Sequence, residues 1–146
     1  MQKGNQNQKI MKDNERKFDL ENRLIDFADM VIEVVEQLPN GKAANHLGGQ
    51  LVRSGTAPAL LYGEAQASES NADFIHKTKI ILKELRETQI CHKIIRKRNF
   101  IEMTLMEKVL KENGELVAIF TASVKTASQN RDKDKGKNQK PEEAAE

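Results

Sequence analysis

Apolar side chains recur every three or four residues along four consecutive segments of the chain, and short polar breaks separate these segments. A repeat at that spacing places the apolar residues on one face of an α-helix, whereas a half-buried strand would alternate at every second residue. Four amphipathic helices with short connections are expected to be neighbours that run alternately up and down. The pattern therefore predicts an all-α fold, an antiparallel up-and-down four-helix bundle.

The first and fourth helices carry wide apolar faces. The first is expected to end at Pro39, Asn40 and Gly41, which cannot continue a helix well, and the fourth to cover about residues 102–126. The predicted core positions of the first helix are Leu20, Leu24, Phe27, Val31, Val34 and Leu38. Those of the fourth are Met106, Leu110, Val117, Phe120 and Val124.

The second helix, expected over about residues 42–67, has a narrow stripe of small residues and an internal proline, Pro58. A proline inside a helix removes a donor and costs about 3 kcal/mol, and each interior glycine costs about 1 kcal/mol relative to alanine. This helix contains Gly48, Gly49, Gly55 and Gly63. We therefore expect another backbone to approach it closely, and we expect the hydroxyl of Ser54 to bond back to a helical carbonyl.

The third helix has a defined start, because Ser70 followed by Asp73 resembles a capping box with a short acid. It is expected to end around Arg98 and Asn99. Its predicted inward face consists of Phe74, Thr78, Ile81, Leu85, Thr88, His92 and Ile95.

The two ends of the chain are polar and almost free of large apolar groups, so they cannot offset the entropy of ordering themselves. We predict a mobile N-terminal tail over residues 1–17, one bundle domain with one core over 18–127, and a disordered C-terminal tail over 128–146. The single Cys91 and the lack of a charged-then-apolar leader favour the cytoplasm. No apolar run reaches the roughly 20 residues that span a bilayer, so no membrane association is expected.

The net charge of +2 is unevenly distributed. Residues 1–17 carry five basic and two acidic side chains, whereas 18–127 carry 14 basic and 15 acidic ones. A protein that coats a polyanion usually has a basic surplus on its folded part. Any nucleic-acid site on this chain must therefore be local.

No catalytic arrangement is found. Asp73 and His76 have the carboxylate-x-x-His spacing of di-iron bundles, but a second such pair is missing, and a solvated or hydrogen-bonded histidine is the simpler interpretation. Cys91 and His92 are adjacent, so they point about 100° apart on a helix and cannot act as nucleophile and base. No phosphate-binding glycine motif is present. We expect no enzyme activity, no metal and no cofactor.

Charge geometry offers two candidate surfaces. Lys93, Arg96, Lys97 and Arg98 cluster at the end of the third helix, and in an up-and-down bundle Lys42 lies at the same end. These cations either complement the helix dipole or contact a polyanion such as RNA or DNA. The first helix is acidic, so it either forms a solvated face or meets the basic helix of another subunit. Its outward acids are Asp26, Asp29, Glu33 and Glu36.

Three stretches of the chain resemble a known family. These are ENRLIDFADMVIEVVEQLP, QLVRSGTAPALLYGEAQASES and ADFIHKTKIILKELRET, and the likeness covers about residues 18–126. They resemble the bacterial four-helix-bundle proteins encoded in intervening sequences of large-subunit ribosomal RNA genes, the S23 family. The positions that carry the likeness, to which we assign structural roles, are Arg53, Ser54, Tyr62, Glu64, Ala65, Asp73, Phe74, Lys77, Glu84, Leu85, Glu87 and Thr88.

The resemblance implies an antiparallel four-helix bundle that assembles as a ring-like homopentamer with a central channel. A relative, the accessory protein of diversity-generating retroelements, implies binding to nucleic acid and to a reverse transcriptase. The chain departs from the usual pattern after Thr88, where many members have an aromatic pair and this one has Gln89-Ile90-Cys91-His92.

Two functional hypotheses follow. The first is a non-enzymatic homo-oligomer that binds RNA or DNA through its local basic cluster. The second is a protein scaffold that recruits a partner through its faces or tails without binding nucleic acid, which the wide apolar face of the first helix favours.

Overall fold

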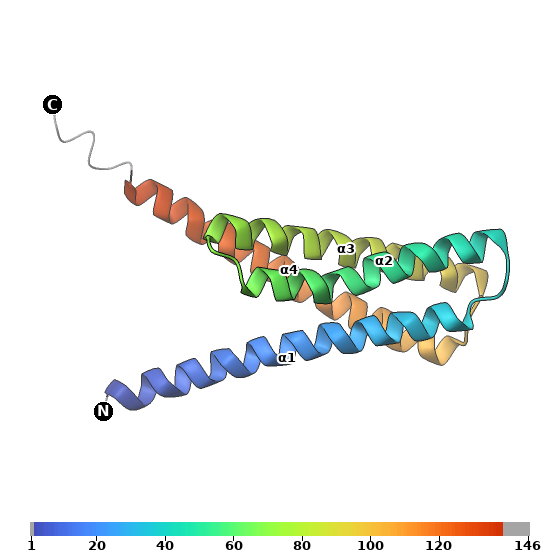
Figure 1. Cartoon of the computed structure of the whole chain (residues 1–146), viewed down its shortest axis with the longest axis horizontal. Helices are drawn as coiled ribbons and strands as arrows, with labels where there is room; N and C mark the ends of the chain where they lie inside the picture. The colour runs from blue at the N-terminus through green and yellow to red at the C-terminus, as the bar shows by residue number, and fades with distance from the viewer. Residues whose placement is uncertain (1, 139–146) are drawn as a thin grey trace.

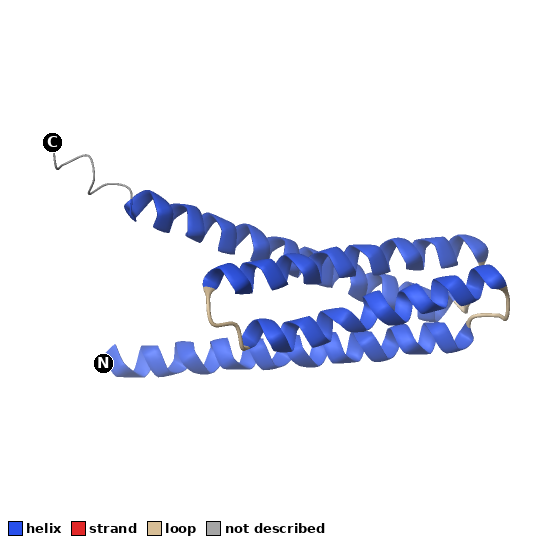
Figure 2. Cartoon of the chain, turned by 45° about the horizontal axis from the view of Figure 1, so that its top comes forward, coloured by secondary structure: helices blue, strands red, loops and turns tan. Residues whose placement is uncertain are grey.

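The structure is a computed structural model that describes residues 2–138, except for the side chains of residues 2–4, 13–18 and 137–138. Within that range the chain forms helices α1 (Gln2–Gln37), α2 (Lys42–Gln66), α3 (Asn71–Arg98) and α4 (Met103–Asn138). Each helix runs antiparallel to the one before it (Figure 1). Short connections join the helices, and this part of the chain has no strand (Figure 2). The predicted all-α four-helix bundle is confirmed.

The helices occupy the corners of the bundle in chain order. α2 packs between α1 and α3, and α4 packs against α3. α1 and α4 complete the bundle, where Arg23 of α1 forms ion pairs with Glu112 and Glu115 of α4. The backbones of α1 and α3 do not approach each other in the part of the chain that the structure describes. These two helices therefore lie at diagonally opposite corners, and their solvent-facing sides lie on different sides of the bundle.

The core is continuous along the bundle and is made of aliphatic side chains with a few aromatic rings. Its largest fully buried members come from all four helices: Leu24, Phe27, Val31, Val34, Leu51, Ile81, Leu85, His92, Ile95, Met106, Val109 and Leu116. Most predicted core positions are confirmed. Phe74 is an exception, because 36% of it is exposed at the N-terminal end of α3.

Two glycines of α2 allow α1 to approach closely. A Cβ added at Gly55 would lie 2.6 Å from Cγ1 of Val31, and one added at Gly48 would lie 3.3 Å from Cδ1 of Leu38. The predicted close approach is therefore confirmed at these two positions. It is wrong within the single chain at Gly49 and Gly63, where an added Cβ would meet nothing within 4 Å.

α3 begins and ends where its sequence predicts, and both of its ends are capped. The side chain of Ser70 accepts a hydrogen bond of 3.2 Å from the backbone N–H of Asp73. At the other end Asn99 adopts a left-handed conformation with φ 53°, and its N–H donates to the carbonyl of Arg96. The N–H of Phe100 donates to the carbonyl of Ile95, which completes a Schellman motif and stops the helix.

α1 and α4 are longer than their apolar stripes predict. α1 begins at Gln2 rather than near residue 18, and α4 ends at Asn138 rather than near residue 126. Residues such as Gln, Lys, Met and Arg have good helix propensity, so backbone hydrogen bonding continues past the last buried position without an apolar partner. Helical conformation does not test mobility, so the mobile tails over 1–17 and 128–146 stay a prediction, and Met1 and residues 139–146 lie outside the described part.

None of the helices over residues 2–138 combines the length and the apolar character that crossing a bilayer requires.

Candidate nucleic-acid interface

The end of the bundle that holds the α1–α2 and α3–α4 connections carries the predicted basic cluster, called here the basic end (Figure 1). α3 reaches it with three cations in its last turn, and α2 starts there at Lys42. The side chains of the basic end are all exposed: Lys42, Lys93, Arg96, Lys97 and Arg98. The structure therefore places the five predicted residues at one end of the molecule.

The cap of α3 helps to fix where this end presents its charge. The guanidinium of Arg98 lies 5.8 Å from the centroid of the Phe100 ring, within cation–π range. Phe100 and Ile101 pack against the core, so the connection after Asn99 is anchored. The carbonyls exposed at the C-terminus of α3 favour cations in its last turn, which accounts for part of the cluster.

None of the five cations forms an ion pair with any side chain that the structure describes. Two acids are also exposed at this end, Glu36 at the end of α1 and Glu102 in the α3–α4 connection. Four of the five cations belong to α3, so α3 carries most of the positive charge of this end. Unpaired cations in this arrangement can contact phosphates without first breaking internal interactions.

The resemblance motif forms the seam between α2 and α3 and lies away from the basic end. The guanidinium of Arg53 on α2 hydrogen-bonds to Glu84, with Nη1 3.0 Å from Oε2, and to Glu87 through Nη2. Nη2 also lies 3.1 Å from Oε1 of Gln50. The hydrogen bond to Glu87 and the charge of Glu84 raise the pKa of Arg53, so the arginine stays charged. Arg53 thus neutralises both acids in the middle of α3.

Ser54 forms the buried part of this seam. Its Oγ lies 2.8 Å from Oγ1 of Thr88, and Thr88 Oγ1 also lies 2.8 Å from the carbonyl oxygen of Glu84. Ser54 and Thr88 have no exposed surface. The prediction that Ser54 bonds back to a helical carbonyl is therefore wrong, because α3 supplies a hydroxyl partner within reach. The pair satisfies two buried hydroxyls and adds a polar contact that fixes the register of α2 against α3.

The remaining motif residues lie near the opposite end. Nζ of Lys77 is 3.7 Å from Glu64 and 3.8 Å from Asp73. Tyr62 is buried, its ring meets that of Phe120 edge-on with centroids 6.2 Å apart, and burial raises the pKa of its hydroxyl. These contacts join α2, α3 and α4.

His92 is the most unusual polar group of the core. It is fully buried, and its Nδ1 lies 3.0 Å from Oδ1 of Asn113, whose Nδ2 donates to the carbonyl of Leu85 at 2.9 Å. Because the amide oxygen accepts, Nδ1 carries the proton, and Nε2 is left with no hydrogen-bond partner among the described residues. Burial lowers the pKa of His92 to about 4, so the ring is neutral at pH 7. A neutral ring edge-on to Phe27 fits this apolar site.

Cys91 is buried beside the carbonyl of Leu47, with Sγ 3.7 Å from the oxygen. Burial, with a smaller contribution from Glu87, raises the pKa of the thiol to about 11. The protonated form dominates at pH 7, and a thiolate is the nucleophilic form. Cys91 therefore has the properties of a small core residue.

No group of three or more His, Cys, Asp or Glu side chains suited to a metal ion occurs among the described residues. His76 is exposed on α3, and Asp73 faces Lys77 instead. The carboxylate-x-x-His spacing noted in the sequence therefore has no further ligands around it.

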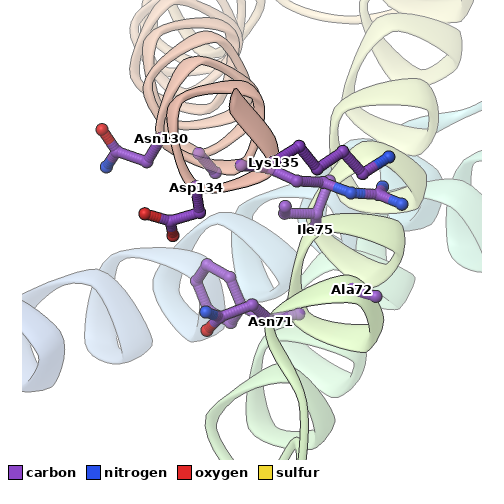
Figure 3. Close-up of a pocket in the computed structure, with 9 residues that line it drawn as sticks. Asn71, Ala72, Ile75, Asn130, Asp134 and Lys135 are labelled. Atoms are coloured by element: carbon purple, nitrogen blue, oxygen red, sulfur yellow. The ribbon is translucent and has the colours of Figure 1, made fainter. Parts of the chain in front are cut away.

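A cavity of about 380 Å³ lies at the end remote from the basic cluster, between the start of α3 and the last turns of α4 (Figure 3). Phe74 lines it and also lines a second cavity of about 400 Å³ that extends to Tyr62 and Phe120. Asp134 and Lys135 stand on the rim, so the first cavity presents both signs of charge. It shows no convergent set of polar groups for one ligand.

Sequence reasoning missed Asn113, which holds His92 and the carbonyl of Leu85 across the α3–α4 contact. A lone asparagine in a helix that otherwise turns apolar residues inward is the signal that could have found it, because buried amides are retained where they satisfy other buried polar groups.

The fold and the α2–α3 seam define the class of this protein as an all-α helical-bundle protein. A family model described as 23S rRNA-intervening sequence protein matches residues 16–122. The chain therefore belongs to the 23S rRNA-intervening sequence protein family, as its sequence motifs predict.

The fold is similar to that of a crystal structure of a protein with unknown function from the S23 ribosomal protein family of Bacteroides thetaiotaomicron. The two chains share 26% sequence identity with a TM-score of 0.66, and the match covers 72% of this chain and 97% of that one. No match was found among curated proteins.

Proposed function

We propose that this protein is a non-enzymatic, cytoplasmic homo-oligomer that binds RNA or DNA through its basic end. The observation that carries the proposal is the set of five exposed cations gathered from α2 and α3, none of which has an acidic partner in the described part of the chain. Clustered cations release condensed counterions when they meet a phosphate backbone, and this release drives binding. The family name connects such proteins with ribosomal RNA genes and supports a nucleic-acid partner.

Assembly into a ring-like oligomer, a pentamer by family resemblance, is part of this proposal. Its support is the set of large apolar side chains exposed on the outward sides of the helices. Leu60 of α2 is 71% exposed, and Ile25 and Ile90 are more than half exposed on α1 and α3. Apolar groups on several faces fit contacts with further chains.

The test is filter binding of structured RNA and duplex DNA at low salt with the variant Lys42→Gln/Arg96→Gln/Arg98→Gln. We expect the affinity to fall at least tenfold, and the slope of log affinity against log salt to fall by about two to three units, because each lost phosphate contact removes roughly 0.9 unit. The matched control, Lys108→Gln/Lys111→Gln/Lys125→Gln, removes the same charge from exposed positions of α4 and keeps the affinity.

Equal losses in the two variants would show that net charge alone attracts the nucleic acid. Absence of any affinity at low salt would reject the nucleic-acid part of the proposal and favour the second candidate, a protein scaffold. The exposure of Leu60 together with Val52 on α2 supports that candidate. Protein partners that are retained from nuclease-treated lysate by the full-length chain, and lost with Leu60→Gln, would identify it.

A further inference from the structure

Two oppositely charged surfaces lie at opposite corners of the bundle. The acidic face of α1 consists of exposed carboxylates around two exposed isoleucines. Its members are Ile25, Asp26, Asp29, Ile32, Glu33 and Glu36. Ile25 is 51% exposed and Ile32 is 39% exposed, and none of the four acids forms an ion pair with a described side chain. This face offers a partner apolar contact surrounded by negative charge.

The basic face of α3 has the same construction with the opposite sign. Its members are Lys79, Lys83, Arg86, Ile90, Lys93, Ile94 and Lys97, all of which are exposed. Ile90 is 56% exposed and Ile94 is 44% exposed. The mid-helix acids of α3 are turned toward α2, where Arg53 neutralises Glu84 and Glu87. The outward side of α3 is left with unpaired cations around an apolar centre.

We propose that the acidic face of α1 binds the basic face of α3 on a second copy of this chain. The proposal deepens the oligomer proposed above and rests on it. Opposite charges around matching apolar centres favour this pairing over any contact of a face with its own copy, because two acidic or two basic faces repel. A nucleic acid is a poorer occupant of the basic face, since phosphates leave Ile90 and Ile94 without an apolar partner.

The diagonal placement of the two helices decides the type of contact. An isologous dimer would need both faces on the same side of the molecule, so that each could meet its counterpart at once. Here α1 and α3 occupy opposite corners, and each copy uses one face toward each of two neighbours. The contact is therefore heterologous, and it generates a closed ring or an open filament.

The positions of the two faces along the bundle axis favour a ring. α1 and α3 run in parallel toward the basic end (Figure 1). Ile32 comes five residues before the last residue of α1, and Ile94 comes four before the last residue of α3. At 1.5 Å per residue both lie about 6 to 8 Å from the helix ends, and Glu33 and Lys93 lie at similar heights. Copies that point the same way can thus pair without an axial step, which closure into a ring requires together with a rotation between neighbouring copies.

In such a ring the cations of the basic end are divided between the subunit contact and the nucleic-acid site. Lys93 and Lys97 belong to both the basic end and the basic face, so the subunit contact covers part of them. Lys42, Arg96 and Arg98 remain on the free rim, and they repeat once per subunit.

The test uses charge reversal on the full chain, read out as mass by light scattering at micromolar concentration. Asp26→Lys/Asp29→Lys reverses two of the four acids, and Lys83→Glu/Arg86→Glu reverses two of the five cations. Each change removes much of the attraction between the faces and adds like charges to part of the contact, and we expect each variant to fall to the mass of one chain. The four changes together exchange the signs at these four positions, and we expect that variant to recover the assembled mass. Ile25→Gln/Ile90→Gln removes the more exposed isoleucine of each apolar centre without a change in charge and is expected to dissociate as well.

The matched control is Glu69→Lys/Glu107→Lys, which makes the same charge change at exposed positions outside both faces and is expected to assemble. Circular dichroism distinguishes dissociation from unfolding. An assembled mass that survives either double reversal, or no recovery in the fourfold variant, would overturn this contact while leaving the oligomer intact. A monomeric wild type would overturn both. Nucleic-acid binding through Lys42, Arg96 and Arg98 is measured separately and does not depend on the outcome.

Discussion

His92 shows how one buried polar side chain sets a pH limit for the whole fold. The ring is enclosed, its Nδ1 is hydrogen-bonded to Asn113, and its buried Nε2 has no hydrogen-bond partner among the described residues. A proton added at Nε2 would create a charged donor in a site that cannot solvate it. The neutral ring is therefore a condition of the packed state.

We expect the contribution of His92 to the free energy of unfolding to be at its maximum above about pH 6.5 and to decrease as the pH falls toward 4. The folded pKa of about 4 lies below the unfolded value of 6.5, so the unfolded chain binds more protons in this interval. The contribution lost by complete protonation is at most about 3.5 kcal/mol, because the two pKa values differ by about 2.5 units and one unit corresponds to about 1.4 kcal/mol. Urea unfolding at pH 7 and pH 5 measures it.

The control for this prediction is the exposed histidine variant His76→Gln, which keeps the same dependence. In His92→Leu the decrease between pH 7 and pH 5 shrinks, although the variant is less stable throughout because Asn113 loses a partner. A wild-type stability that is flat over this pH range would contradict the assignment.

At the scale of elements, the packing of α1 on α2 depends on Gly55. We expect Gly55→Ala to lower the free energy of unfolding by about 1 to 3 kcal/mol, because the added methyl would lie 2.6 Å from Val31 and neither backbone can easily retreat. Denaturant unfolding monitored by circular dichroism measures the change.

The comparison variant is Gly63→Ala on the same helix, where an added Cβ meets nothing within 4 Å. It is expected to raise stability by about 0.5 to 1 kcal/mol through helix propensity alone. Adding Val31→Ala to Gly55→Ala should recover part of the loss. Equal effects at the two glycines would show that close packing of α1 does not explain Gly55.

The helices and their buried faces could be predicted because periodicity is a local property. Val31, Ile81 and Leu85 were assigned to the core from spacing alone, and the structure buries them. The ends at Gln2 and Asn138 were not predictable from the same signal, since helix formers extend a helix beyond its last apolar contact.

Hydrogen-bond partners on different helices could not be predicted from local sequence patterns either. Ser54 bonds to a hydroxyl 34 positions away, and Asn113 bonds to His92 at a separation of 21. Which side chains meet depends on the relative height of two helices, which no single-helix pattern contains. The basic end was predictable because helix order alone brings Lys42 to the end of α3.

At the scale of the whole molecule, the proposed ring and the proposed nucleic-acid site reinforce each other. A ring repeats Lys42, Arg96 and Arg98 around one rim, so a long nucleic acid can contact several copies at once. Linked contacts raise the apparent affinity by about 100-fold or more over a single site.

We therefore expect Asp26→Lys/Asp29→Lys, which dissociates the ring, to weaken binding of a long RNA although it makes each chain more positive. Binding of a short RNA that reaches one subunit should not weaken. Filter binding with RNAs of two lengths measures the difference, and the assembled control Glu69→Lys/Glu107→Lys should bind both. Tighter binding of the long RNA by the dissociated variant would show that total charge outweighs multivalency.

The extended arms of α1 and α4 leave the bundle at the end remote from Lys42 and Arg98 (Figure 1). A fluorophore or affinity handle fused to either arm would thus stand far from the cationic rim. Anchoring the protein to a sensor surface by such a handle would present every rim outward. The order of the helices along the chain thus provides the orientation that is needed to observe single nucleic-acid molecules as they bind.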